Sequence, residues 1–212
     1  MRNLLTRTAS GIVYVALMVA AVFTPWVAMP LLLFLTIVGL YEFYKLCQNP
    51  KLRWVGPIWI LLPLCVLFLI WIPQNPAQVL GFFILIWMSD TAAYVFGSLF
   101  GKHKLAPNIS PGKTWEGFLC SCVFTVGLAI GLSYIPFFQS AGLQLWHWIV
   151  IALLTEVFGL MGDLIESLFK RKAGVKDSGN IIPGHGGVLD RVDSILFATL
   201  PVWLFCLMTA AL

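Results

Sequence analysis

The chain has 212 residues, of which 60% are hydrophobic and only 10% are charged. Soluble domains carry about 25% charged residues, so this composition excludes an ordinary water-soluble protein and favours one that lies in a lipid bilayer. The net charge of +4 comes from basic residues in four separate regions that we expect to face anionic lipid, so it gives no argument for nucleic-acid binding.

Seven apolar segments follow one another along the chain, and a helix needs roughly 20 apolar residues to cross the hydrocarbon core. We therefore predict an all-α fold, a polytopic transmembrane helix bundle of about seven spans that forms a single integral membrane domain. The first segment is too long for the apolar part of a signal peptide, so we expect it to be retained. The predicted spans are 11–29, 30–46, 54–72, 78–100, 115–138, 145–169 and 189–212.

The basic residues predict how the bundle is oriented. All 13 lysines and arginines precede the first span or fall in alternate connections, so they lie on one side of the predicted bundle. Cytoplasmic loops carry an excess of lysine and arginine, which places the N-terminus in the cytoplasm and the C-terminus outside. The four basic regions are 2–7, 45–53, 102–113 and 170–191.

Six carboxylates lie within or at the ends of predicted spans, where each costs on the order of 2.5–3.5 kcal/mol to insert. One alone could form a salt bridge between helices, but their helical spacing directs several toward one membrane face. Mg²⁺ takes oxygen ligands from one or two carboxylates and from substrate phosphates. We therefore predict a Mg²⁺–phosphate site at the membrane surface, with a second cation as an open alternative. The six residues are Asp90, Glu156, Asp163, Glu166, Asp190 and Asp193.

The connection before the last span combines positive charge with glycine. Lys170, Arg171 and Lys176 could neutralise a polyphosphate, although the positive-inside rule alone would also explain them. The segment 183–187 reads Pro-Gly-His-Gly-Gly, and glycine lets backbone N–H groups come close to an anion. We expect His185, within this segment, to contact phosphate or to handle a proton.

A second connection, between the predicted fourth and fifth spans, contains the segment 110–114, Ser-Pro-Gly-Lys-Thr. A phosphate-binding P-loop is rejected, because the spacing is wrong and no predicted strand precedes the segment. Ser110, Lys113 and Thr114 remain side chains suited to phosphate. We expect Glu116 to pair with Lys113 or to cap the helix that follows.

Residues 167 to 193 resemble the signature of the phosphatidate cytidylyltransferases, also called CDP-diacylglycerol synthases. The pattern runs Ser-x-apolar-Lys-Arg, then Lys-Asp, His-Gly-Gly and Asp-Arg-apolar-Asp. A stripe of Asp90, Tyr94 and Gly97 also resembles the upstream part of that family, so the resemblance covers roughly residues 87 to 196. The signature positions present here are Ser167, Lys170, Arg171, Lys176, Asp177, His185, Gly186, Gly187, Asp190, Arg191 and Asp193.

The resemblance implies an enzyme that transfers the cytidylyl group of CTP to phosphatidate, giving CDP-diacylglycerol and pyrophosphate in phospholipid biosynthesis. It implies a homodimer in a bacterial inner membrane with the active site on the cytoplasmic face, formed by residues 87–212 and preceded by N-terminal spans over 1–86. The residues expected to act in catalysis are Lys170, Arg171, Lys176, Asp177, His185 and Arg191. Those expected to bind substrate are Ser110, Lys113, Thr114, Ser167, Gly186 and Gly187. Those expected to hold Mg²⁺ are Asp163 and Asp190, assisted by Asp193 or Asp90.

Three other hypotheses remain open from the sequence. A CTP-dependent transferase for another lipid phosphate, such as an ether lipid, would carry the same motifs, because acyl chains are recognised by shape. An anion transporter would suit carboxylates within the membrane. However, the chain shows no repeated halves with broken helices, and its carboxylates gather near one face. An inactive scaffold would not be expected to keep an intact signature.

Overall fold

The structure is a computed structural model that describes residues 2–182 and 186–210, and the side chains of 8–182 and 186–209. The long helices are α1 (Arg2–Phe23), α2 (Pro25–Leu46), α5 (Pro76–Phe100), α6 (Trp115–Ser133), α8 (Leu145–Lys172) and α9 (Leu189–Ala210). A continuous helical run combines η1 (Pro50–Trp54), η2 (Pro57–Leu61), α3 (Leu62–Cys65), η3 (Val66–Trp71) and α4 (Ile72–Gln74). The short elements are α7 (Pro136–Gln139) and the paired strands β1 (Lys104–Ala106) and β2 (Ser110–Thr114).

The predicted helical bundle is confirmed. Within the described residues, six helical segments are long and apolar enough to cross a membrane, and a shorter apolar helix covers Thr8–Phe23. This shorter segment corresponds to the first predicted span, so the count of seven spans stays a prediction. The six segments are Pro25–Leu46, Pro50–Gln74, Pro76–Phe100, Trp115–Ser133, Leu145–Lys172 and Leu189–Thr209.

Two predicted boundaries were wrong, and proline explains both. The first connection lies at Thr24, because Pro25 occupies the first position of α2 and Thr24 precedes it in an extended conformation. Proline is favoured at the first position of a helix, because the N–H group that it lacks would have no partner within the helix there. Pro30, which was predicted to begin the second span, lies inside α2. The predicted fifth span also ends earlier, at Ser133, and a separate short helix begins at Pro136.

The small antiparallel pair β1–β2 was not predicted. It occupies the connection between α5 and α6, and its register pairs Lys104 with Thr114 and Ala106 with Ser110. The segment that looked like a loop is therefore the second strand of a hairpin. This strand leads directly into α6 at Trp115.

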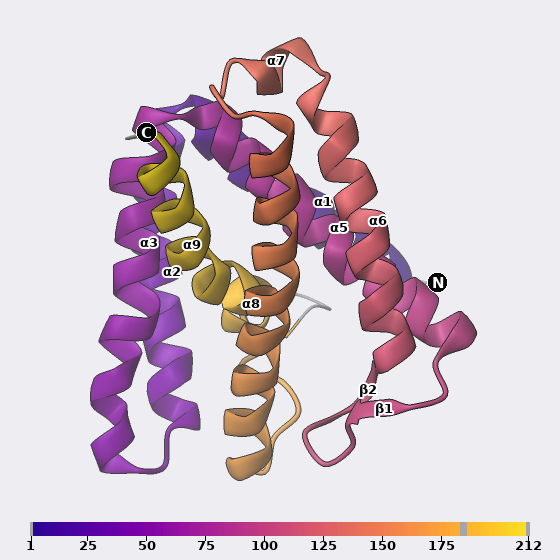
Figure 1. The fold of residues 1–212 in the computed structure, drawn as a ribbon. Helices are drawn as coiled ribbons and strands as arrows, with labels where there is room; N and C mark the ends of the chain where they lie inside the picture. The colour runs from indigo at the N-terminus through magenta and orange to yellow at the C-terminus, as the bar shows by residue number, and fades with distance from the viewer. Residues whose placement is uncertain (1, 183–185, 211–212) are drawn as a thin grey trace.

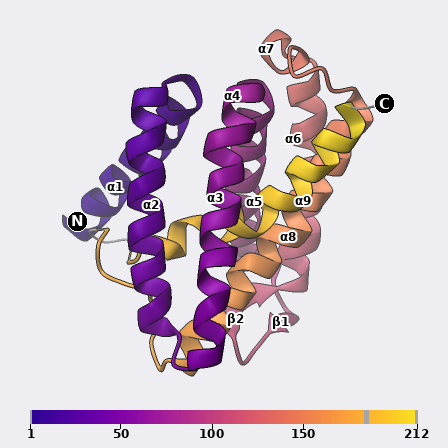
Figure 2. The ribbon, with the colours of Figure 1, turned by 90° about the vertical axis from the view of Figure 1, so that its left-hand side faces the viewer.

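The helices that will form the site are neighbours in space. α5 packs against α6, α6 against α8, and α8 against α9, while α9 runs obliquely across the bundle (Figures 1 and 2). The connection between α2 and η1, the β1–β2 hairpin and the C-terminal end of α8 lie at one end, and α7 lies at the other (Figure 1). Segments of three of the four basic regions are thus at one end, whereas the predicted orientation places all four there. The side of the membrane itself stays a prediction.

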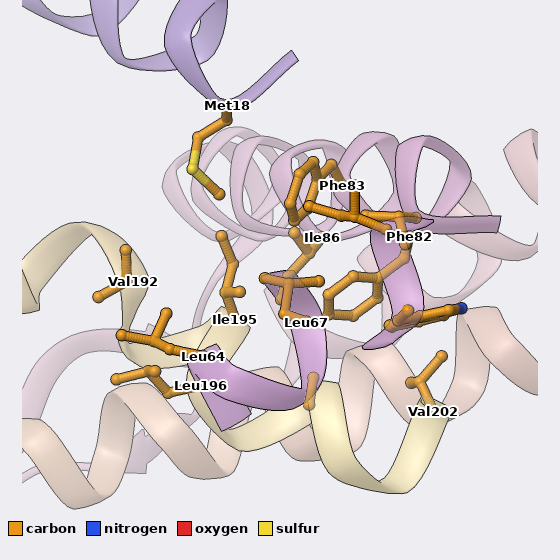
Figure 3. Packing of buried hydrophobic residues seen from close by; sticks show 14 of the residues in the cluster. Met18, Leu64, Leu67, Phe82, Phe83, Ile86, Val192, Ile195, Leu196 and Val202 are labelled. Carbon is orange, nitrogen blue, oxygen red and sulfur yellow. The ribbon is translucent and has the colours of Figure 1, made fainter. Parts of the chain in front are cut away.

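The apolar core fixes the rotation of α9. Val192, Ile195, Leu196 and Val202 are all almost fully buried and recur at helical spacing, so one face of α9 points into the core. Figure 3 shows these side chains together with apolar residues from α1, α3, η3 and α5. The labelled partners are Met18, Leu64, Leu67, Phe82, Phe83 and Ile86. Because this face is fixed, Asp190 and Asp193 near the start of α9 point toward a cavity between this helix and its neighbours.

Helices α5 and α6 approach each other closely through glycine. A Cβ atom added to Gly117 would lie 2.7 Å from the carbonyl oxygen of Ala93 and 2.9 Å from Cα of Gly97. Real Cβ atoms essentially never come so near, so the present helix spacing requires glycine at Gly117. The spacing matters for function because the β1–β2 hairpin joins the ends of these two helices.

Replacing Gly117 with alanine is expected to push α5 and α6 apart and to cost about 1–3 kcal/mol of stability, as overpacking does. Gly127→Ala on the same helix is the matched control, because a Cβ atom there meets no heavy atom within 4 Å. We expect thermal unfolding in detergent to show a lower midpoint for Gly117→Ala and an unchanged or raised midpoint for Gly127→Ala. Equal shifts in both variants would contradict the close approach.

Candidate active site

A cavity of about 740 Å³ opens between α5, α6, α8, α9 and the β1–β2 hairpin. The described site residues from the sequence analysis line it, except Glu166, Gly186 and Gly187. His185 lies outside the described residues. The fold thus gathers residues from across more than 100 positions of sequence, while their roles stay predictions. The predicted residues lining the cavity are Asp90, Ser110, Lys113, Thr114, Asp163, Ser167, Lys170, Arg171, Lys176, Asp177, Asp190, Arg191 and Asp193.

Three carboxylates form an acidic cluster, which we define as Asp163, Glu166 and Asp193. One oxygen atom from each lies within 4.8 Å of the others. Glu166 is completely buried, and among the described residues its Oε1 atom has no hydrogen-bond partner. Carboxylates at such distances repel one another unless positive charge lies near them. Oxygen donors in this arrangement fit a hard divalent cation.

Asp190 lies outside this cluster, which differs from the predicted metal ligands. Its carboxylate accepts hydrogen bonds from Lys170 Nζ at 2.6 Å, from the Ser178 N–H at 2.9 Å and from the Gly187 N–H at 2.9 Å. The Ser178 hydroxyl adds a fourth contact at 3.0 Å. These contacts engage both oxygens of Asp190, and the group of three neighbouring carboxylates contains Glu166 in its place. The role of Asp190 as a Mg²⁺ ligand stays a prediction. The sequence held the signal, since Glu166 follows Asp163 by three residues on one helix face.

Lys170 connects helices α8 and α9. Its Nζ atom lies 2.5 Å from Glu166 Oε2 and 2.6 Å from Asp190 Oδ1, and the side chain is buried. The ammonium group of Lys170, which the sequence analysis expected to contact substrate phosphate, thus contacts two carboxylates in this structure. A buried cation placed between two carboxylates stabilises both of them and fixes the distance between their helices.

The β1–β2 hairpin is attached to α8 at two points. Lys113 Nζ lies 2.5 Å from Asp163 Oδ2, so a basic residue from β2 reaches the acidic cluster. Arg171 donates from Nε to the Ile109 carbonyl oxygen at 3.1 Å and from a terminal nitrogen to the Val175 carbonyl oxygen at 3.3 Å. The contact with Ile109 therefore attaches the hairpin to the C-terminal end of α8 beside the cavity.

The prediction that Glu116 pairs with Lys113 or caps α6 was wrong. Glu116 Oε1 instead lies 2.5 Å from His103 Nδ1, and its carboxylate accepts the backbone N–H groups of Lys102 and His103. Thr114 caps α6, because its Oγ1 accepts the Gly117 N–H at 3.2 Å. Glu116 is the second residue of α6, and there its carboxylate lies beside the donors of Lys102 and His103. Lys113 is not available to it, because the hairpin directs Lys113 into the cavity toward Asp163.

Two further buried carboxylates organise the site. Glu156 accepts hydrogen bonds from Ser121 Oγ at 2.9 Å and Thr125 Oγ1 at 2.6 Å, so it joins α8 to α6 at the cavity wall. Glu42 on α2 contacts the connection before α9 and the start of that helix. The sequence analysis missed Glu42, although it is the only acidic residue before Asp90 and lies in an apolar span.

Comparison with known proteins supports the resemblance that residues 167–193 indicated. A family model described as "Cytidylyltransferase family" matches residues 66–209, which is more than half of the chain. Phosphatidate cytidylyltransferases of Staphylococcus haemolyticus and Staphylococcus saprophyticus are each 49% identical to the chain, over 115 and 119 residues. That of Staphylococcus aureus is 47% identical over 115 residues. Each alignment covers 54% of this chain and 43% of the relative, so the chain spans less than half the length of the curated relatives that it matches.

Proposed function

The chain belongs to the cytidylyltransferase family, and on that premise we propose that it transfers the cytidylyl group of CTP to phosphatidate, forming CDP-diacylglycerol and pyrophosphate. The observation that carries the proposal is that two members of the acidic cluster, Asp163 and Asp193, line one cavity together with several basic side chains. The curated relatives bear the name of this activity. The basic side chains lining the cavity are Lys104, Lys113, Lys170, Arg171, Lys176 and Arg191.

The reaction joins two anions, so the site must chiefly position them and neutralise charge. An oxygen of the lipid phosphate attacks the α-phosphorus of CTP and forms a new P–O bond. The bond from that phosphorus to the β-phosphate oxygen breaks, and pyrophosphate leaves with the electron pair. No strong general base is required, because a phosphate monoester is already ionised at neutral pH. Lys176 and Arg191 are both exposed at the cavity and are suited to meet the phosphates of CTP.

The acidic cluster would hold Mg²⁺, which when bound supplies positive charge close to the phosphates. Its unpartnered Glu166 oxygen supports this assignment. Asp90 and Asp190 remain candidates for a second cation, and Asp90 lines the same cavity. The protein's own part is to keep the carboxylates in place: Lys113 holds Asp163, and Lys170 holds Glu166.

The proposed setting is a bacterial membrane, with the cavity at the cytoplasmic face. The six long apolar helical segments among the described residues and the gathering of basic segments at one end support it. A lipid substrate would then enter from the side, with its phosphate at the interface and its acyl chains between helices. A homodimer stays a prediction.

The purified protein in detergent is expected to release pyrophosphate from CTP when phosphatidate and Mg²⁺ are present, and much less from ATP, GTP or UTP. Replacing phosphatidate with an ether-lipid phosphate tests the lipid backbone in the same assay. Folded protein that turns over none of the lipid phosphates would contradict the proposal. Uptake of an anion by vesicles containing the protein, without nucleotide consumption, would favour the transporter hypothesis.

A further inference from the structure

We propose that Glu42 is a positioning residue of the site, whose carboxylate anchors the connection before α9 and the first turn of that helix. This inference rests on the proposed function, because the anchored helix carries Asp190 and Asp193 near its start. Glu42 lies outside residues 66–209, so the family match assigns it nothing. It belongs to α2, which is far from α9 in the sequence.

Glu42 caps α9 from another helix. Its side chain is 1% exposed. Oε1 accepts the Val188 N–H at 3.1 Å, and Oε2 accepts the Leu189 N–H at 2.8 Å. The first N–H groups of a helix have no partner within it, and negative charge is favoured at that end. Glu42 supplies both the acceptors and the charge, so the start of α9 depends on a carboxylate from α2.

The same carboxylate is connected to the acidic cluster through a chain of contacts. Glu42 Oε2 lies 3.1 Å from Ser178 Oγ, which lies 3.0 Å from Asp190 Oδ2. Asp190 in turn contacts Lys170, and Lys170 contacts Glu166. The Ser178 hydroxyl lies within hydrogen-bond distance of both carboxylates and can donate its one proton to either. It therefore bridges Glu42 and Asp190. Movement of Glu42 would therefore reach the cluster through groups in direct contact.

Two glycines let the connection close around Glu42. A Cβ atom on Gly187 would lie 2.7 Å from Glu42 Oε2 and would overlap with the hydroxyl of Ser178. A Cβ atom on Gly179 would overlap with the Glu42 carboxylate. The N–H of Gly187 is also donated to Asp190. These contacts give Gly187 a reason to be glycine in addition to the predicted contact with phosphate.

Glu42→Gln is the sharpest variant, because glutamine keeps the shape but turns one acceptor into a donor that faces backbone N–H groups. We expect the amide hydrogens of Val188 and Leu189 to exchange about tenfold faster, measured by mass spectrometry in detergent. We also expect the Mg²⁺ concentration for half-maximal turnover to rise about tenfold, as when an outer partner of a metal ligand is lost. Turnover at saturating Mg²⁺ should fall by less than this factor. Ser178→Ala, which keeps the backbone contacts to Glu42, should raise the same Mg²⁺ concentration about threefold.

Gln78→Met is the control for a general loss of stability. Gln78 is buried at the start of α5, accepts from Trp71 Nε1 at 2.9 Å and donates to the Ala141 carbonyl oxygen at 3.1 Å. It does not line the cavity. We expect this variant to unfold at a lower temperature while keeping the exchange rates at Val188 and Leu189 and the Mg²⁺ response of the unchanged protein.

The outcomes separate the two proposals. An Mg²⁺ response and exchange rates in Glu42→Gln equal to those of the unchanged protein would overturn the role of Glu42, as would equal shifts in Gln78→Met. If the unchanged protein forms no product, the proposed function fails, and the exchange rates at Val188 and Leu189 alone decide whether Glu42 anchors α9.

Discussion

Asp193→Asn is expected to lower CTP-dependent product formation by at least about 100-fold, because loss of even an outer partner of a metal ligand costs 10–100-fold. Asp193 is buried near the start of α9, and one of its carboxylate oxygens lies within 4.8 Å of oxygens of Asp163 and Glu166. Asparagine keeps the size of the side chain but removes its charge and one of its anionic oxygens. The cavity keeps its shape, whereas its attraction for a cation is weakened.

Stability measurements distinguish this effect from misfolding. Without divalent cations, Asp193→Asn should unfold at the same or a higher temperature than the unchanged protein, because a neutral amide replaces a buried carboxylate that lies close to two others. Saturating Mg²⁺ should stabilise the unchanged protein, by about 2.7 kcal/mol when its concentration is 100 times the dissociation constant, and should stabilise the variant much less. Equal stabilisation of both proteins would remove Asp193 from the cation site.

Glu156→Gln is the matched control for activity, since it also neutralises a buried carboxylate in the cavity wall. Glu156 accepts from two hydroxyl groups of α6, which can turn to meet an amide. The expected loss is below about tenfold, in line with a changed neutral hydrogen bond. A loss as large as that of Asp193→Asn would show that charge anywhere in the cavity matters equally and that the acidic cluster is not special.

Lys170→Met is expected to cost about 3–5 kcal/mol of stability, the usual result of removing one partner of a buried ion pair. The variant leaves Glu166 and Asp190 close together in the protein interior without the ammonium group between them. We therefore expect a markedly lower unfolding midpoint in detergent and no measurable product formation. A purely phosphate-binding lysine would instead lower activity and leave the unfolding midpoint unchanged.

Two companion variants test the physical cause. Lys172→Met removes an exposed lysine two residues away on α8 and should change stability by less than about 0.5 kcal/mol. The double variant Lys170→Met with Glu166→Gln should unfold at a higher temperature than Lys170→Met alone, because one uncompensated charge has been neutralised. A double variant that is less stable than Lys170→Met would contradict the charge-pairing explanation.

The sequence predicted the parts of the fold that depend on apolar length. Helices stand at all seven predicted ranges, because an uninterrupted apolar run of this length has few other ways to satisfy its backbone in a membrane. Most of the predicted site residues also line the cavity, since their motifs lie at the ends of such helices. The break at Thr24 was missed because either Pro25 or Pro30 could occupy the first position of the second helix, and the sequence does not distinguish them.

The finer organisation of the site could not be predicted, because it depends on contacts between distant segments. Asp190 and Asp193 are equivalent in pattern, but the N–H groups of Ser178 and Gly187 engage only Asp190. Glu42 is separated from Leu189 by 147 positions, and nothing local indicates their contact. The β1–β2 hairpin is too short to show a strand pattern. Spacing along the chain identified the candidate carboxylates, while packing assigns them different environments.

The most direct test of the proposed function follows the phosphorus atoms of CTP. The purified protein is mixed with phosphatidate, Mg²⁺ and CTP labelled with ³²P at either the α- or the γ-phosphate. Cytidylyl transfer predicts that α-label enters the lipid fraction and that γ-label appears only in pyrophosphate. Entry of γ-label into the lipid, or a lipid fraction that stays unlabelled while the protein is folded, would contradict it.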